Sequence, residues 1–450
     1  MTKLLDAART SFDGEELRRG ASRVLLDNWT GASSVPSHTL YPHQWSWDSA
    51  FIAIGLRHLS VRRAQLELET LLGAQWADGR IPHIVFNPAV PLGAYFPSPD
   101  FWRSSTAGAA AGAPAAPETS GIVQPPVHAL AAWLVHEADP QESLRRGFLA
   151  RMYPKLAAWH RYLTAQRNLG GSGLVTTVHP WEPGMDNSPC WDGPLARISP
   201  AAPDTFRRAD LDHGAAADRP TDLDYGRYVR LAADYRDSGY ADEPGRHAFA
   251  VEDPCVNALL IASEHSLARI ATAVGADPAV HEERARRLTA TLVLRLWHPA
   301  YGMFLCRDLV EGDLITERSV SGLIPLIVPG LPDEVTSALR TTLDGPHFRA
   351  AETGLVASYA FTGPSFDRTR YWRGPAWFNT AWLIERGLRG YGADKRADQL
   401  HSAFLASSGA SGFAEYVDPV TGEGHGTRDF AWTAALALDL LARQTRAGSR

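Results

Sequence analysis

Helical periodicity runs through almost the whole of this 450-residue chain and restricts it to an all-α fold class. Apolar residues recur at helical spacing in about a dozen segments. The segment 48–59 is apolar on every face, which is typical of a helix buried on all sides. Strand signals are few, and the clearest predict a hairpin between residues 302–306 and 313–316. The predicted helices are 15–29, 48–59, 60–76, 123–137, 143–166, 221–236, 253–274, 280–297, 319–327, 333–343, 375–391, 395–407 and 430–444.

The alternation of all-apolar and amphipathic helices predicts an α/α toroid, with an inner ring buried on both sides and an outer amphipathic ring. An α-solenoid is the alternative, but the sequence shows no fixed repeat period. We expect one catalytic domain spanning residues 1–450. The longest irregular segments, about 78–120 and 169–220, are rich in Trp, Phe, His and Pro. Loops of that length are usually functional or disordered, and this composition is not typical of disorder, so we expect them to form an ordered wall around a site.

Composition excludes several classes of partner. The chain carries 44 basic and 50 acidic residues without a basic block, so nucleic acid is not an expected partner. No apolar run reaches the roughly 18 residues of a membrane span, and residues 1–20 do not resemble a signal peptide. Cys190, Cys255 and Cys306 are too widely spaced to indicate a disulfide framework, which favours a cytoplasmic setting. A homo-oligomer remains open.

Two turn-rich segments, 179–189 and 412–422, each place acids beside aromatic residues. Hydrolysis of a glycosidic bond needs two carboxyl groups, one to protonate the leaving oxygen and one to activate water or attack carbon. A neighbouring Trp can stack on a sugar face, and low polarity raises the pKa of a carboxyl group, which suits a general acid. The alternative is that these acids are ordinary turn residues or helix caps.

Other chemistries find little support. The sequence has no phosphate-binding Gly-Lys-Ser/Thr loop, no G-x-S-x-G elbow and no H-E-x-x-H motif. Its 16 His residues show no metal-ligand spacing, so neither a metal nor another cofactor is expected. Terpene cyclases also use aromatic-lined helical barrels, but they need clustered acids, and the nearest match, 222–224, lies in a predicted helix cap.

Six motifs in order resemble those of glycoside hydrolase family 63. They are Tyr-Pro-His-Gln-Trp-Ser-Trp-Asp-Ser-Ala-Phe at 41–51, Gly-Arg-Ile-Pro-His at 79–83, Gln-Pro-Pro at 124–126, the segment 181–186, Tyr-Trp-Arg-Gly-Pro-Ala-Trp at 371–377 and Phe-Ala-Glu-Tyr at 413–416. The resemblance spans most of the chain, and the size is similar to that of compact bacterial members that hydrolyse glucosylglycerate or mannosylglycerate. It implies an (α/α)6 barrel, no catalytic metal, and hydrolysis with inversion at the anomeric carbon.

The same resemblance implies roles for individual residues. Asp186 matches the general acid of the family and Glu415 its general base. Glu182 is the local alternative for the acid, although it could equally orient the loop or bind a hydroxyl group. Asp48 matches a residue that holds glycosyl hydroxyls; the alternative is a plain helix N-cap. The other residues assigned to the sugar pocket are Trp45, Trp47, Gln124, Trp181, Gly184, Trp372 and Trp377.

The leaving-group side follows from the same comparison. Tyr41, Arg219, Tyr225 and Tyr371 match positions that hold glycerate in glucosylglycerate-hydrolysing members. The planar guanidinium of Arg219 suits a carboxylate, although a surface salt bridge is the alternative. Residues 424–429 depart from the glutamine-containing version of the family, which bears on acceptor specificity.

Together these observations predict an inverting α-glycosidase whose partner is a small-molecule sugar substrate. Glucosylglycerate is the first expectation, mannosylglycerate the second, and a neutral di- or oligosaccharide the third. A catalytically inactive sugar-binding protein is the alternative from another class. The presence of both Asp186 and Glu415 argues against it.

Overall fold

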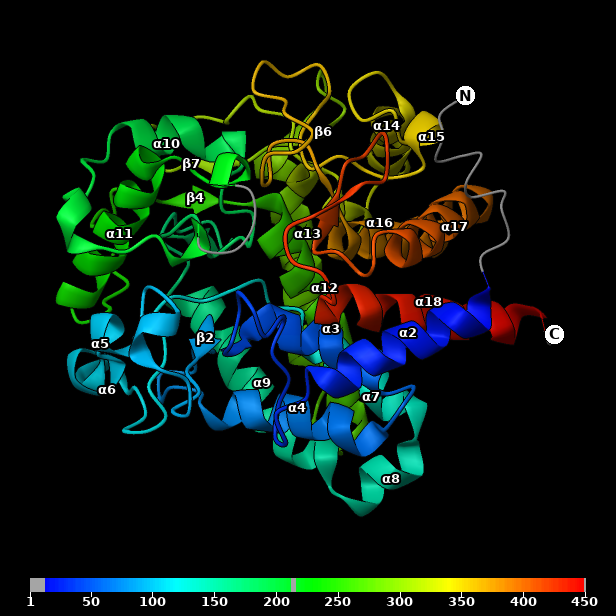
Figure 1. The fold of residues 1–450 in the computed structure, drawn as a ribbon, viewed down its shortest axis with the longest axis horizontal. Coiled ribbons are helices and arrows are strands. Elements are labelled where there is room, and N and C mark those ends of the chain that lie inside the picture. Colours follow the sequence, from blue (N-terminus) through cyan, green and yellow to red (C-terminus); the bar gives the residue numbers. More distant parts are fainter. Residues whose placement is uncertain (1–12, 212–215, 449–450) are drawn as a thin grey trace.

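The protein is mostly helical, as seen in a computed structural model that describes residues 13–211 and 216–448 (Figure 1). The helices are α2 (Gly14–Asp27), α3 (Ser46–Leu56), α4 (Val61–Gly73), α5 (Pro99–Trp102), α6 (Ser104–Ala107), α7 (His128–Ala138), α8 (Pro140–Arg145), α9 (Phe148–Ala165), α10 (Asp192–Ala196), α11 (Asp222–Asp237), α12 (Pro254–Ala273), α13 (Ala279–Leu296), α14 (Asp333–Asp344), α15 (Ala350–Thr353), α16 (Phe378–Gly390), α17 (Asp394–Ala410) and α18 (Ala431–Gly448). No helix in the described ranges is long and apolar enough to cross a membrane.

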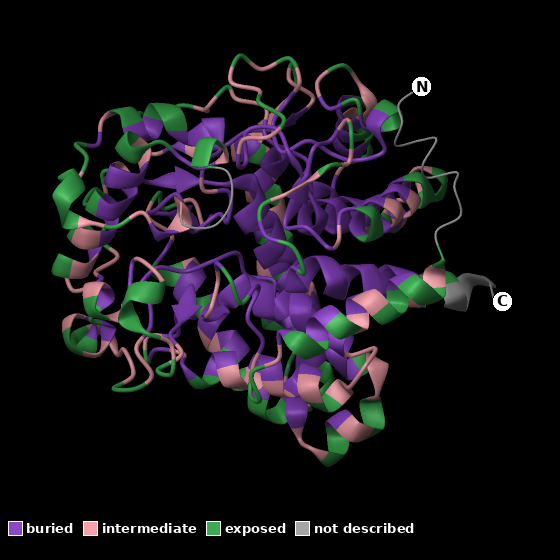
Figure 2. Ribbon diagram, in the orientation of Figure 1, coloured by how far each residue is buried: buried purple, intermediate pink, exposed green. Residues whose placement is uncertain are grey.

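Six elements form a closed inner ring. α3 contacts α7, α7 contacts α12, and α12 contacts the short 3-10 helix η8 (Ile324–Ile327). η8 in turn contacts α16, α16 contacts α18, and α18 returns to α3. Every residue of α3 is buried, and Figure 2 shows its ribbon in the buried colour throughout. The chain therefore folds as the (α/α)6 toroid that the alternation of helix types predicts.

The outer ring consists of amphipathic helices that cover this inner ring. α4 packs on α3 and α7, α9 on α7 and α12, and α13 on α12. α17 contacts α16 and α18, and α2 lies along α18 (Figure 1). In α2, Leu17, Ala21, Val24 and Leu25 are buried while the acidic residues of its first turn are not. Spacing of three and four residues puts these four side chains on one face, toward the ring.

Three of the predicted helix starts depend on capping side chains that the structure shows. The side chains of Ser60, Thr221 and Asp253 each accept a hydrogen bond from the backbone N–H three residues further on. Each bond satisfies a donor that the first helical turn leaves without a partner. These starts are confirmed at α4, α11 and α12.

Other predicted helices are corrected. Residues 319–327 form two short 3-10 helices rather than an α-helix, because Pro325 lacks the N–H that an α-helix would use there. Residues 123–127 lie outside the helix, since Pro125-Pro126 delays the start of α7 to His128. The predicted helix 143–166 is divided between α8 and α9 at Gly147, whose φ is +61°.

The strands are all two residues long, too short for alternation to reveal them. They are β1 (Gln44–Trp45), β2 (Ile84–Val85), β3 (Thr176–Thr177), β4 (Val251–Glu252), β5 (Trp297–His298), β6 (Met303–Phe304), β7 (Arg307–Asp308), β8 (Ala376–Trp377), β9 (Tyr416–Val417) and β10 (Gly424–His425). The predicted hairpin between residues 302–306 and 313–316 is confirmed only near its turn, where the backbone N–H of Ile315 donates to the carbonyl of Cys306. β6 pairs instead with β5.

A second apolar cluster packs beside the ring, around α11 and the long irregular segments. Its large side chains include Trp45, Trp76, Trp102, Trp181 and Trp191, all at most 8% exposed. This explains why tryptophans such as Trp45, Trp76 and Trp181 occur outside the α-helices. They give the loops a core of their own, which holds extended backbone in fixed positions.

The close contact between α3 and α18 yields a stability prediction. A Cβ at Gly55 would lie 2.3 Å from the Cα of Ala435, so Gly55→Ala must separate the two helices. We expect the free energy of unfolding to fall by about 1–3 kcal/mol in denaturant titrations. Gly73→Ala in α4 is the control, because nothing lies within 4 Å of its Cβ position. The control should be neutral or stabilising by up to about 1 kcal/mol, and equal losses would contradict the packing argument.

Candidate active site

A cavity lies where several inner helices begin. It encloses about 810 Å³ of space between atoms, part of it open to solvent. Trp47 and Asp48 come from the first turn of α3, Gln124 precedes α7, and Glu415 lies directly before β9. The lining residues are Pro36, Leu40, Tyr41, Trp45, Trp47, Asp48, His83, Tyr95, Phe96, Gln124, Trp181, Gly184, Asp186, Asp210, Arg219, Pro220, Tyr225, Tyr228, Tyr371, Glu415, Phe430 and Trp432.

Asp186 reaches this cavity from a tight turn between β3 and α10. Gly184 has φ of +70°, and a Cβ there would lie 2.4 Å from Cζ2 of Trp47. Only glycine lets the turn pass so close to that indole. The hydroxyl of Tyr228 donates to the backbone carbonyl of Asp186 at 2.6 Å, which fixes the end of the turn.

The electrostatics of Asp186 suit a group that gives up a proton near neutral pH. Burial raises the pKa of its carboxyl group to about 7, opposed by the charge of Arg219 and reinforced by Glu415. Glu182, the alternative acid, does not line the cavity and pairs with Arg167 at 2.7 Å. Asp186 is therefore the carboxyl of this turn that can meet a substrate.

Glu415 lines the same cavity and is surrounded by hydrogen-bond donors. Its Oε1 accepts from the hydroxyls of Tyr41 at 2.8 Å and Tyr371 at 3.4 Å, and its Oε2 from Thr427 N at 3.3 Å. Arg219 Nη2 lies 3.7 Å from Oε2. Burial raises the pKa of Glu415, while Arg219 and these donors hold it down. These contacts favour the carboxylate form, which a general base requires.

Arg219 is buried inside the cavity, so the surface salt bridge considered for it is wrong. It is 8% exposed, donates to the Tyr41 hydroxyl at 3.2 Å, and lies 4.6 Å from the ring centre of Tyr371. Four acids line the same cavity: Asp48, Asp186, Asp210 and Glu415. Among the lining residues in the described ranges, Arg219 is the one Arg or Lys.

Asp48 and Gln124 both line the cavity at the start of α3. The Oε1 of Gln124 accepts from Trp47 N at 3.1 Å, which orients the amide beside the first turn. The N-cap position of α3 is Trp45, so the interpretation of Asp48 as a cap is wrong. Burial raises the pKa of Asp48 well above its ordinary value.

Two predicted pocket residues lie behind the cavity surface. Trp372 and Trp377 stack with ring centres 3.9 Å apart and are both 1% exposed. Trp372 takes φ of +58°, so the chain turns sharply after Tyr371, which does line the cavity. The strand pair β8–β9 then places Trp377 against Tyr416, 4.6 Å between ring centres. Both tryptophans support Tyr371 from behind and do not face the cavity.

Several lining residues were not assigned to the site from sequence. Tyr95 and Phe96 come from the irregular segment 78–120, and Asp210 from 169–220. Phe430 and Trp432 were attributed only to a helix. His83 could have been found, because it ends the Gly-Arg-Ile-Pro-His motif. The remaining residues missed are Pro36, Leu40, Pro220 and Tyr228.

The segment 424–429, where the sequence departs from the family pattern, lies against Glu415. The backbone N–H of Glu415 donates to the carbonyl of Thr427 at 2.8 Å. In return, the backbone N–H of Thr427 donates to the side-chain Oε2 of Glu415. A Cβ on Gly426 would lie 2.4 Å from Glu415 Oε2, and its φ is +68°. The backbone of this segment therefore shapes the position of the Glu415 carboxylate.

The described side chains include no cluster typical of a metal site. Across residues 13–211 and 216–448, no group of three or more His, Cys, Asp or Glu could hold a metal ion. What the cavity does offer is two carboxyl groups with surrounding hydroxyl, amide and guanidinium donors, a set suited to proton transfer.

Comparison with known proteins agrees with this arrangement. A family model described as "Mannosylglycerate hydrolase MGH1-like glycoside hydrolase domain" matches residues 41–433. The mannosylglycerate hydrolase of Rubrobacter radiotolerans is 40% identical, covering 95% of this chain and 97% of that protein. The glucosylglycerate hydrolase of Mycolicibacterium hassiacum is 37% identical, covering 96% and 99%.

A solved structure extends the similarity to the fold. The family 63 mannosylglycerate hydrolase of Thermus thermophilus superimposes with a TM-score of 0.86 and 38% identity, covering 94% of this chain and 99% of that one. The chain is a glycosidase, and it belongs to glycoside hydrolase family 63, in the group defined by the MGH1-like domain.

Proposed function

We propose that this enzyme hydrolyses the α-glycosidic bond of a glycosylglycerate, with inversion at the anomeric carbon. The observation that carries the proposal is the Arg219 guanidinium inside a cavity lined by four acids. A neutral substrate would offer this buried cation only uncharged hydroxyl acceptors, whereas a carboxylate carries the opposite charge and can accept two hydrogen bonds from it. The names of the two related hydrolases support the same substrate class.

The reaction we propose uses the two carboxyl groups in separate roles. Asp186, protonated near neutral pH, donates its proton to the glycosidic oxygen as the bond to the anomeric carbon breaks. Glu415 takes a proton from water as that water attacks the opposite face of the sugar. Tyr41 and Tyr371, which donate to Glu415 Oε1, orient the base. We also propose a cytoplasmic setting, supported by three free cysteines.

Glucosylglycerate is the substrate we propose first, and mannosylglycerate is the second candidate, favoured by the 40% identical relative of that name. A screen of purified protein against glucosylglycerate, mannosylglycerate, kojibiose and trehalose tests the assignment. NMR of the reaction should show the β-anomer as first product of an α-linked substrate. Turnover confined to the two neutral disaccharides would refute the glycerate proposal.

The roles of the two carboxyl groups can be tested separately. Asp186→Asn and Glu415→Gln should each lower kcat about 10²–10⁴-fold, because each removes one proton-transfer group while preserving side-chain size. Thermal unfolding should show that both variants fold. Near wild-type turnover in either folded variant would refute the role of that residue.

The pKa shifts predict a bell-shaped pH profile of kcat/KM. Activity should fall on the alkaline side with a midpoint near pH 7, since deprotonation removes the proton that Asp186 donates. On the acid side it should fall as Glu415 becomes protonated, at a pH above the ordinary range of a glutamate because burial raises that pKa. Residual activity of Asp186→Asn should lack the alkaline limb. A profile that stays flat well above neutral pH would contradict the acid assignment.

The contribution of Arg219 to glycerate binding can be tested at the pH optimum of each variant, because loss of Arg219 also raises the pKa of Glu415 and Asp186. Arg219→Ala should lower kcat/KM for the glycosylglycerate by about 2–5 kcal/mol, the scale for truncating one partner of a buried charged pair. It should also weaken inhibition by D-glycerate. Activity on a neutral α-glucoside should fall much less.

Arg373→Ala is the matched control, because Arg373 is also buried and pairs with Asp192 but does not line the cavity. The control should leave glycerate inhibition unchanged. Equal losses on charged and neutral substrates in Arg219→Ala would show that this residue only supports the fold.

A further inference from the structure

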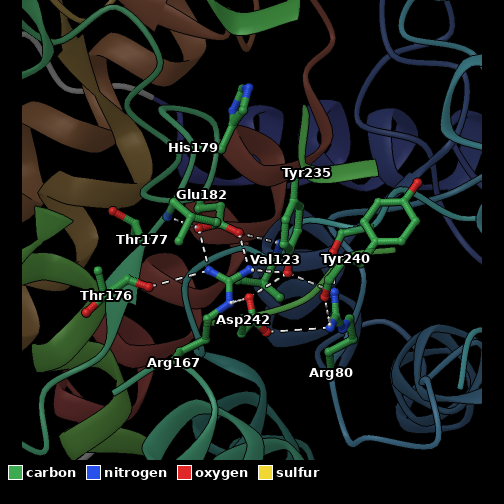
Figure 3. Close-up of polar contacts among 12 residues, drawn as sticks. Arg80, Val123, Arg167, Thr176, Thr177, His179, Glu182, Tyr235, Tyr240 and Asp242 are labelled. Carbon is green, nitrogen blue, oxygen red and sulfur yellow. Dashed lines mark hydrogen bonds and ion pairs between the residues drawn. The ribbon is translucent and has the colours of Figure 1, made fainter. Parts of the chain in front are cut away.

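A buried network of charged side chains lies directly behind the turn that carries Asp186, and the reaction described above does not use it (Figure 3). Its central pair is Arg167 and Glu182, both with side chains 0% exposed. Two ions withdrawn from water are costly unless their geometry and hydrogen bonds are nearly complete. The contacts of this pair must therefore offset the cost of burying two charges beside the turn that carries Asp186.

Both oxygens of Glu182 are fully used. Oε2 accepts from Arg167 Nη1 at 2.7 Å and from Val178 N at 2.6 Å. Oε1 accepts from Arg167 Nη2 at 2.7 Å and from Val123 N at 3.2 Å. Four donors leave the carboxylate no place for a substrate proton, and the residue does not line the cavity.

The two backbone donors belong to different segments of the active site. Val123 directly precedes Gln124, whose amide lines the cavity and receives the Trp47 N–H. Val178 begins the turn that contains Trp181 and ends at Asp186. One carboxylate therefore sets the distance between a sugar-binding segment and the acid-bearing turn.

Arg167 is itself fixed from its other side. Its Nε lies 2.9 Å from Asp242 Oδ1, and that carboxylate accepts from the hydroxyls of Tyr162 and Tyr235, each at 2.6 Å. Arg80 approaches Asp242 at 3.5 Å. Figure 3 shows Arg167 between Glu182 and Asp242. The guanidinium group is therefore held on both sides and cannot rotate away from Glu182.

Arg80 fixes the backbone of residues 121–123, which directly precede Gln124. It donates to the carbonyl of Gly121 at 2.9 Å, two residues before Val123, and to that of Tyr240 at 3.0 Å. The segment 121–123 is thus held by Arg80 at one end and by Glu182 at the other. This leaves the backbone directly before Gln124 little freedom.

We infer that Glu182, held by Arg167, is a positioning residue that joins the acid-bearing turn to the Gln124 segment, and so aligns Asp186 with the bound sugar. The inference depends on Asp186 being the general acid, and it applies to any α-glycoside this enzyme cleaves. It predicts that loss of the pair impairs sugar binding and proton donation together, because both segments move.

The test compares Glu182→Gln with Asp186→Asn on two leaving groups. An α-D-glucosyl or α-D-mannosyl fluoride needs no proton on its leaving group, so Asp186→Asn should lose far less activity on it than on the glycosylglycerate. Glu182→Gln should lose about 10²-fold in kcat/KM on both substrates, the scale of a misplacement of about 1 Å. Loss on the glycosylglycerate alone would overturn the inference, because Glu182 would then act only through proton donation.

Asp439→Asn is the matched control for a damaged buried ion pair. Asp439 has no exposed side-chain surface and pairs with Arg57, at the C-terminal end of α3, remote from the cavity at its N-terminal end. It should lower the melting temperature but leave kcat/KM on the fluoride unchanged at temperatures well below unfolding. An equal loss of kcat/KM in the control, or full activity in folded Glu182→Gln, would overturn the inference.

Arg167→Lys covers the case in which Glu182→Gln fails to fold. Lysine keeps the charge but provides one point contact in place of the two-pronged contact, so a smaller loss on both substrates is expected, and none would refute the role. Wild-type activity on the fluoride without activity on either glycosylglycerate would refute the proposed substrate while leaving the positioning role testable.

Discussion

Closure of the inner ring is the constraint on which the rest of the structure depends. A helix such as α3, buried along its whole length, has no face that tolerates water, so it is stable only between two neighbours. The six ring elements, most of whose residues are buried, cover one another's apolar surfaces by closing into a ring. Their sides are then fully occupied by packing. Helix ends and connecting loops are what remain for chemistry, and the cavity lies at the beginnings of α3, α7 and α18.

An excess of negative charge governs the chemistry at those helix starts. Four acids and one arginine share the cavity, and burial raises the pKa of Asp48, Asp186 and Glu415. Asp210 is compensated outside the cavity by Arg208, with contacts of 2.8 and 2.9 Å. The two proposed catalytic carboxyls differ in their donors: Glu415 accepts three hydrogen bonds, which favour its ionised form. Environment rather than residue type thus separates an acid from a base.

Sequence predicted the fold class and the family, because helical spacing, caps and motifs are local properties of the chain. Asp186 and Glu415 could be singled out since each lies in a turn-rich segment beside aromatics. The 319–327 prediction failed where Pro325 and the ring's geometry outweighed an apolar pattern. The pairing of Arg80 with Asp242 joins residues 162 positions apart in the chain, and no local pattern reveals it. The rear position of Trp372 and Trp377 also depends on a strand pairing between distant segments.

The 3.7 Å approach of Arg219 to Glu415 has a consequence for the occupied enzyme. The same guanidinium lowers the pKa of both Glu415 and Asp186. An anion that neutralises it would therefore raise both values at once, making the base more basic and keeping the acid protonated to higher pH. By thermodynamic reciprocity, protonation of either carboxyl would strengthen binding of that anion. A glycerate leaving group, as proposed above, would thus act as an effector of its own cleavage, shifting the working pH range of the site upward whenever it is bound.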